Sequence, residues 1–171
     1  SIAEIELNSG SNLAIEGNVN MQKTQLSEGS LVTFSGSGTS HVDTIQGSSL
    51  TQVVIKSALY TDTIESAVAI QSGGTLVVNE QVTGDVTLVD MGTEADLATV
   101  KGTVSAQKNA HVVAERVEGA VVATHAARVT VDAVVGDVTA GGASTVVAKT
   151  VQGSVAIQSG GTLVVNEQVT G

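Results

Sequence analysis

A 17-residue sequence that occurs twice without change limits what this chain can fold into. VAIQSGGTLVVNEQVTG runs from Val68 to Gly84 and recurs from Val155 to Gly171, 87 residues later. So long a run of identities excludes chance, and a fixed period is the signature of an architecture in which each unit packs mainly against its neighbours. The chain is therefore expected to be a stack of similar units.

A shorter period of 17 or 18 residues lies inside the long one and is marked by a glycine that follows a Val-x pair. These corner glycines are Gly84, Gly102, Gly119, Gly136, Gly153 and Gly171. The position two after each glycine is Val86, Val104, Val121, Val138 and Val155. The position two before the next glycine is Val100, Val117, Val134, Val151 and Val169. Both columns contain only valine, which predicts two ladders of core side chains.

Within each unit, alternate positions are apolar, which is typical of a strand with one buried face. Val121 and Ala123 are expected to point inward and Val122 outward, and a second strand is expected around Arg128 to Asp132. A unit this short cannot bury its own apolar face, but a stack of units can. The sequence predicts an all-β fold, a parallel β-helix (β-solenoid) with rungs of about 17–18 residues, grouped in 87-residue repeats and coiled right-handed.

Glycine and asparagine fall where such a coil has to bend. Gly92, Lys108-Asn109, Gly141-Gly142 and Gly160-Gly161 lie in the middle of rungs. These residue types tolerate positive φ, and we expect the corner glycines to serve in the same way. Proline is absent. This fits a chain whose strands pair on both sides, because proline cannot donate to a backbone ladder.

The regular pattern covers residues 63–171, whereas residues 1–62 follow it less well. We interpret residues 1–62 as irregular rungs of one continuous domain. The stretch around Phe34 and Tyr60, which are the only aromatic residues other than histidine, is interpreted as variant rungs; a non-solenoid insertion is the alternative. Roughly ten rungs spaced about 4.8 Å apart would make a rod about 45 to 50 Å long.

The last rung is expected to carry an uncovered strand edge. Gly171 falls in mid-pattern, and the next position of the register corresponds to Asp85, so we expect a further copy to follow. If Gly171 is instead the natural end, the bare rung would invite head-to-tail stacking into an open filament. Either way, the sequence predicts self-association as the main partnership.

Charge and composition exclude several classes of partner and cofactor. Seven Lys+Arg against 17 Asp+Glu give a net charge of −10, which disfavours nucleic acid and anionic membranes. No apolar run reaches the roughly 18 residues of a membrane span. The absence of cysteine excludes disulfides, iron–sulfur clusters and zinc-thiolate sites. We therefore expect no cofactor, no nucleic acid and no membrane insertion.

No catalytic or metal-binding constellation stands out. His41, His111 and His125 fall in different columns, which disfavours a metal site. The acidic residues are interpreted as a solvated outer face. A polysaccharide-cleaving β-helix needs paired carboxylates in a groove and usually aromatic platforms for sugar rings, and these platforms are missing. We expect that the protein is not an enzyme.

The rung GDVTAGGASTVVAKTVQG, with its G-x-V-x-A, V-x-V and V-x-G elements, resembles the bactofilin family of bacterial polymer-forming β-helical proteins over residues 63–171. That resemblance implies a cytoplasmic filament assembled end to end. The 87-residue duplication instead resembles the repeats of large bacterial surface fibres or adhesins. Both imply a rigid rod without an active site.

Three hypotheses follow. The first is a structural solenoid of a fibre at the cell surface or in the extracellular matrix, where a polysaccharide or another matrix component is a possible partner. The second is an intracellular bactofilin-like cytoskeletal polymer. The third is a carbohydrate-binding or carbohydrate-cleaving β-helix.

Overall fold

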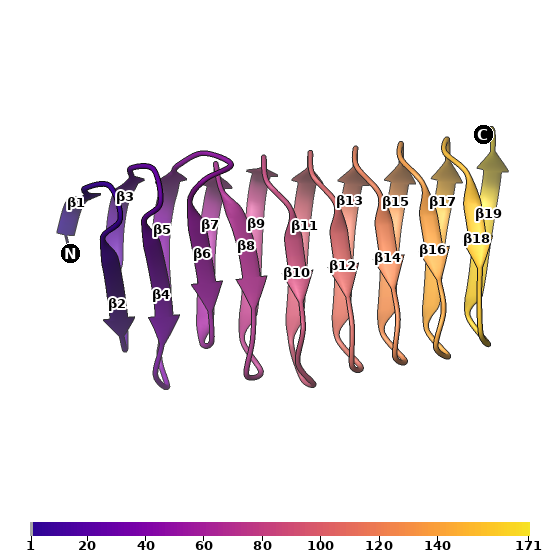
Figure 1. The fold of residues 1–171 in the computed structure, drawn as a ribbon, viewed down its shortest axis with the longest axis horizontal. Helices are drawn as coiled ribbons and strands as arrows, with labels where there is room; N and C mark the ends of the chain where they lie inside the picture. The colour runs from indigo at the N-terminus through magenta and orange to yellow at the C-terminus, as the bar shows by residue number, and fades with distance from the viewer. Residues whose placement is uncertain (1) are drawn as a thin grey trace.

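A computed structural model describes residues 2–171 as a β-solenoid of about 9 turns (Figure 1). The chain alternates between two sheets, and all strand pairs are parallel. The ten-stranded sheet contains β1 (Ile2–Leu7), β3 (Asn20–Leu26), β5 (Thr39–Gln46), β7 (Ala58–Ile64), β9 (Thr75–Val82), β11 (Glu94–Val100), β13 (His111–Val117), β15 (Arg128–Val134), β17 (Thr145–Val151) and β19 (Thr162–Val169). The nine-stranded sheet contains β2 (Asn12–Glu16), β4 (Leu31–Ser35), β6 (Gln52–Ile55), β8 (Ala67–Ile70), β10 (Val86–Leu88), β12 (Val104–Ala106), β14 (Val121–Ala123), β16 (Val138–Ala140) and β18 (Val155–Ile157).

This arrangement confirms the predicted fold class, an all-β parallel solenoid with rungs of about 18 residues. Neighbouring strands in each sheet come from successive turns, so the strands stack along the long axis with the two termini at opposite ends (Figure 1). Ten strands at about 4.8 Å spacing give a ladder roughly 43 Å long. Residues 2–171 contain no helix that is long and apolar enough to cross a membrane.

The pairing register separates a regular part from an irregular part. From β11 to β17, paired residues lie 17 positions apart, as in His111↔Arg128 and Arg128↔Thr145. Nearer the N-terminus the spacing is 19 for Ile2↔Met21, 21 for Leu31↔Gln52 and 15 for Gln52↔Ala67. The region around Phe34 and Tyr60 thus forms β4 to β7, which pair within the same two sheets.

The duplicated sequence carries a β-bulge in both of its copies. In β9, Asn79 and Glu80 lie between the pairs Val78↔Leu97 and Gln81↔Thr99, whereas β11 has one residue in that interval. The register of β19 shifts against β17 at the same place in the repeat. A bulge inserts one unpaired residue and bends the strand locally. Both copies therefore share a local backbone feature as well as a sequence.

The core is a single column of apolar side chains between the sheets, and its members change in size along the axis. Phe34 of β4 is fully buried. In strand register, the same inward position of the nine-stranded sheet is occupied successively by Phe34, Ile55, Ile70, Leu88, Ala106, Ala123, Ala140 and Ile157. Three successive alanines occupy this column in β12, β14 and β16, and the buried residues of the facing strands β13, β15 and β17 are also valine and alanine.

Candidate functional site

The predicted valine ladders lie at inward positions of both sheets, in β10 to β19. Eight of the ten valines have 0 or 1% exposure: Val86, Val104, Val121, Val138, Val100, Val117, Val134 and Val151. Val155 and Val169 differ from the other ladder members, with 38% and 46% of their surface exposed. Both belong to β18 and β19, which are edge strands of their sheets. An inward side chain is fully buried only where rungs cover it on both sides.

The corner glycines are required for a different reason than the sequence indicated. None of Gly84, Gly102, Gly119, Gly136, Gly153 and Gly171 has a positive φ, so the expectation of left-handed backbone there is wrong. A Cβ on Gly119 would instead overlap the carbonyl group of Gly102, and the relation repeats up the stack. The corners approach one another too closely for any side chain, and glycine is needed because it has none.

The mid-rung bends are where the backbone adopts positive φ. Gly92, Lys108 and Asn109 have φ of +74°, +51° and +62°, as the sequence predicted. In the pairs Gly141-Gly142 and Gly160-Gly161 only one glycine each, Gly142 and Gly160, is left-handed. His125 and Ala126 adopt the same conformation, which their residue types did not signal. Asn109 N–H donates to the His125 carbonyl and Ala126 N–H to the Gly142 carbonyl, so hydrogen bonds connect the bends of three successive rungs.

Two corner acids form specific backbone hydrogen bonds. Asp85 Oδ1 accepts a 2.7 Å hydrogen bond from the backbone N–H of Thr103, and Asp137 Oδ1 accepts one of 2.8 Å from Ser154. Each carboxylate thus ties its corner to the corner of the next rung. Interpreting these acids as only a solvated face was incomplete, because the Gly-Asp dipeptide at the corner marks the contact.

The ion pairs lie on the outer surface; those of Lys23, Lys108 and Lys149 connect neighbouring rungs, whereas Arg116 and Glu118 pair within one rung. Lys149 Nζ lies 2.9 Å from Asp132 Oδ2, and Lys108 Nζ lies 3.8 Å from Asp90 Oδ1. A hydrogen bond from Lys149 to Asp132, together with the charge of that carboxylate, raises the pKa of the Lys149 ammonium. Exposed pairs of this kind contribute little to stability. They align rungs rather than create a reactive group.

The three histidines are not brought together. His41 stacks on Tyr60 on the outer surface, with ring centroids 5.2 Å apart and an interplanar angle of 17°. His111 and His125 lie in different columns, at the start of β13 and in a bend. Among residues 2–171, no three His, Asp or Glu side chains are arranged to hold a metal ion.

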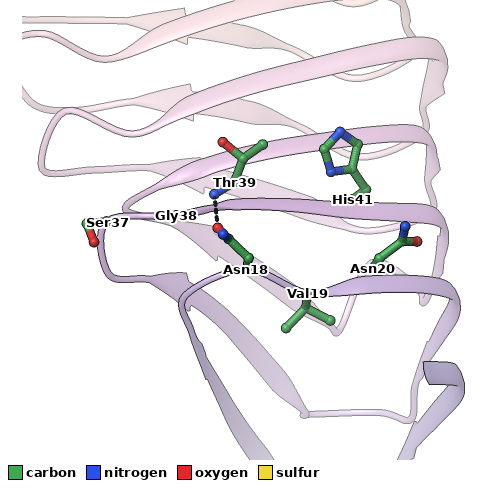
Figure 2. A pocket seen from close by; sticks show the side chains of 7 residues that line it. All are labelled: Asn18, Val19, Asn20, Ser37, Gly38, Thr39 and His41. Atoms are coloured by element: carbon green, nitrogen blue, oxygen red, sulfur yellow. Dashed lines mark hydrogen bonds between the residues drawn. The ribbon is translucent and has the colours of Figure 1, made fainter. Parts of the chain in front are cut away.

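An open depression of about 580 Å³ lies beside β5 near the N-terminal end (Figure 2). Its wall includes Asn18, Ser37, Thr39 and His41. Asn18 Oδ1 accepts a 2.6 Å hydrogen bond from the backbone N–H of Thr39, so this amide is used to join two rungs. No carboxylate lines the depression, and no hydrogen bond joins Ser37 to His41 within the described chain. The arrangement lacks an activated nucleophile or a paired acid and base.

The last strands of the described ladder, β18 and β19, are its edge strands on the C-terminal side, and we call them the open end. Ile157 and Val164 are 48% and 43% exposed, beside the exposed ladder valines. The same 17 residues occur inside the stack as β8 and β9, where Ile70 is completely buried. The same sequence is thus found once between two rungs and once at an edge of both sheets.

The chain matches no protein-family model, no curated protein and no solved structure.

Proposed function

We propose that the protein is a structural solenoid segment that forms or extends a rigid fibre at the bacterial surface or in the extracellular matrix. The observation that carries the proposal is the unbroken parallel ladder. Successive regular rungs pair 17 positions apart in both sheets, and the 17-residue rung Val68–Gly84 recurs unchanged as the rung Val155–Gly171. A fold built by adding such rungs lengthens in one direction, as a fibre does.

The ladder supports a mechanical role because its hydrogen bonds run along the long axis. Each added rung forms backbone bonds to the rung before it, such as the 2.9 Å bond from Val104 N–H to the Ala120 carbonyl. Apolar side chains fill the interior along the whole ladder, and each rung packs against its neighbours. The net charge of −10 favours solubility and repels other acidic rods. The partner that this arrangement favours is further solenoid of the same kind, with no cofactor and no chemical reaction.

An intracellular polymer of the bactofilin kind would use the same ladder and differs in compartment. The recurrence of one 17-residue rung 87 residues later favours the surface fibre, because repeated rungs within one chain extend a rod without separate assembly of subunits.

A second candidate function is carbohydrate binding on the outer face of the ten-stranded sheet. The stacked rings of His41 and Tyr60 are the observation that favours it, because an exposed aromatic face can pack against a sugar. Asn79 Nδ2 donates a 2.8 Å hydrogen bond to Asp62 Oδ1 close by, which places polar groups beside the rings. If this site binds a matrix polysaccharide, Tyr60→Ala abolishes retention on that polysaccharide and Val113→Ala, on the same sheet, does not.

Electron microscopy of native material tests the fibre. Cells and culture medium are imaged with gold-labelled antibodies raised against residues 2–171, before and after protease treatment of intact cells. The proposal predicts labelled thin filaments outside the cell that disappear on treatment. Label confined to the cytoplasm favours the intracellular polymer, and label on isolated particles in both fractions refutes a fibre.

A further inference from the structure

We propose that the outer face of the nine-stranded sheet is a lateral interface, on which a second copy of this chain packs face to face. This inference rests on the proposed fibre and names how its rods associate side by side. We call this surface the neutral face and define it as the outward side chains of the nine even-numbered strands, β2 to β18, which lie side by side along the long axis (Figure 1). The partner presents the same face, so the contact is isologous.

Charged residues are divided unequally between the two sheets. In the nine-stranded sheet, the strands from β4 to β18 contain no Asp, Glu, Lys or Arg, and Glu16 in β2 is the single exception. Every strand of the ten-stranded sheet contains at least one such residue. The chain as a whole has a net charge of −10. Its charge is therefore concentrated away from the neutral face.

The middle of the neutral face is a column of short side chains. In each strand the column is formed by the residue between two inward positions, as Thr87 lies between the buried Val86 and Leu88. In strand register the column consists of Ala14, Thr33, Val54, Ala69, Thr87, Ser105, Val122, Thr139 and Ala156. None of these side chains is longer than that of valine. Two such faces can therefore approach to about 10 Å, the usual spacing of sheets that pack face to face.

The charged side chains that border the neutral face lie at its margins. Asp85 and Asp137 directly precede β10 and β16, and Lys56 directly follows β6. Each of the two carboxylates accepts a hydrogen bond from a backbone N–H of the next rung, which holds it at the corner. A two-fold axis parallel to the ladder sets the corners of one copy opposite the mid-rung bends of the other. At the level of the two acids these bends begin with Val89 and Gly141, so carboxylates do not oppose one another.

The ten-stranded sheet shows why an acidic copy of this chain would pack on the neutral face. On the outside of that sheet, Asp43 lies beside Asp62 and Glu115 beside Asp132 in the register of successive rungs. Contact between two copies through this sheet would bring such carboxylates close together, which is unfavourable. A basic partner would be attracted to the same carboxylates rather than to the neutral face. The charge distribution thus favours a second copy as the occupant of the neutral face.

The size of the neutral face sets the expected strength of the contact. Its nine strands, spaced about 4.8 Å apart and roughly 13 Å wide over three outward residues, give about 500 Å² on each copy. A pair would bury about 1,000 Å², which is at the low end of specific interfaces. We therefore expect a weak, reversible dimer of this chain. Each further rung adds area, so longer ladders would associate more firmly.

Analytical ultracentrifugation of the chain between about 10 µM and 1 mM tests the pairing. We expect a monomer–dimer equilibrium that tightens as salt is added, because the interface is uncharged while the two copies repel each other through their net charge. Raising NaCl from about 20 mM to about 500 mM screens that repulsion and is expected to lower the Kd at least about threefold. A contact made by ion pairs would respond in the opposite direction.

Two pairs of lysine substitutions locate the contact. Ser105→Lys with Thr139→Lys places ammonium groups in the middle of the neutral face, and Thr75→Lys with Thr130→Lys places them on the outside of the ten-stranded sheet as a matched control. Both pairs change the net charge from −10 to −8, so the general repulsion between copies falls equally. The first pair is expected to raise the Kd at least about tenfold, and the control to leave it within about twofold. Circular dichroism melts report that both variants fold.

Three results would overturn the inference. The first is a chain that remains monomeric at about 1 mM in high salt. The second is association that weakens with salt, or that responds equally to both lysine pairs, because the contact then lies on charged side chains elsewhere. The third is a monomeric chain whose retention on cellulose is lost only in Ser105→Lys/Thr139→Lys, which assigns the neutral face to a polysaccharide.

Failure of the lateral contact can be distinguished from failure of the proposed fibre. Filaments outside the cell, formed by a chain that does not pair in solution, would refute the lateral contact and leave the fibre standing. A dimer that is lost in Ser105→Lys/Thr139→Lys, together with native label confined to the cytoplasm, would refute the surface fibre and leave the lateral contact standing.

Discussion

Truncating the same isoleucine in the two copies of the duplicated rung tests how burial differs along the stack. Ile70→Ala and Ile157→Ala remove the same atoms from the same 17-residue sequence. Ile70 is fully buried between Ile55 and Leu88, whereas Ile157 stacks on Ala140 alone and is about half exposed. Any difference in their effects therefore comes from position and not from local sequence.

The magnitude follows from the atoms that lose contact. Removing three buried carbons costs about 2.4 kcal/mol of transfer free energy, and the unfilled cavity raises the loss for Ile70→Ala to about 3.5 kcal/mol. At Ile157, half of that transfer term is already missing and solvent fills the space, so the loss is about 1 kcal/mol. Fraying of the terminal rung before global unfolding would reduce the second value further.

Urea unfolding followed by circular dichroism measures both losses. We expect Ile70→Ala to reduce the free energy of unfolding by about 2 kcal/mol more than Ile157→Ala, which is well outside the error of the method. Equal losses would refute the reasoning. They would mean that the open end is covered in solution, or that β18 does not occupy the register described.

Four further predictions concern single positions. Val121→Asp places an unpaired carboxylate in the valine ladder and is expected to cost at least about 4 kcal/mol, whereas the outward Thr139→Asp costs less than about 1 kcal/mol; equal urea midpoints would show that the facing is wrong. Gly119→Ala forces two corners apart and is expected to cost about 2 kcal/mol or more, whereas Gly141→Ala, whose Cβ would meet its nearest atom at 3.4 Å, is nearly neutral; thermal melts of both variants check the difference. Ala126→Gly relieves a φ of +62° and is expected to stabilise the protein by about 0.5 to 1 kcal/mol, so a lower urea midpoint would contradict the strain. Asp132→Asn removes the carboxylate that raises the pKa of Lys149, so NMR titration should show a lower Lys149 pKa in the variant. Because Lys149 has the higher pKa in the folded state, any stability that this pair contributes is present at pH values below the unfolded-state pKa of lysine. That stability is lost as the pH rises through the folded-state pKa of Lys149.

The architecture was predictable because residues one repeat apart in the sequence pair in neighbouring strands, so the period of the repeat gives the register of the sheets. The valine two positions after each corner glycine recurs without exception from Val86 to Val155, and strand alternation then fixes which neighbours point outward. The same columns led to Val155 and Val169 being grouped with the buried ladder. Sequence periodicity reports the facing of a residue, but burial also depends on whether the next rung is present.

Other features depend on stacking and leave no clear sequence signal. The left-handed backbone of His125 and Ala126 is imposed by the bends above and below, through hydrogen bonds at Asn109 and Gly142. The corner glycines were recognised for the wrong reason, since φ was expected to require them and the close approach of successive corners does. The role of Asp137 as an acceptor for Ser154 N–H was missed because contacts between rungs lie 17 positions apart.

The N-terminal registers were the least predictable part. The spacings of 19, 21 and 15 residues between paired positions break the period that identified the regular rungs. Larger inward residues such as Phe34 and Met21 replace the valine and alanine columns there. The corner glycine of the regular rungs does not recur at a constant spacing in this part either. Loop length absorbs the differences while both ladders continue.

Cryo-electron microscopy of the native assembly tests the central claim, that this chain is part of a continuing structural ladder. We expect filaments in which strands spaced about 4.8 Å apart stack along the filament axis in two parallel sheets. Native particles that are short discrete rods, or that show no such ladder along their axis, would contradict the account.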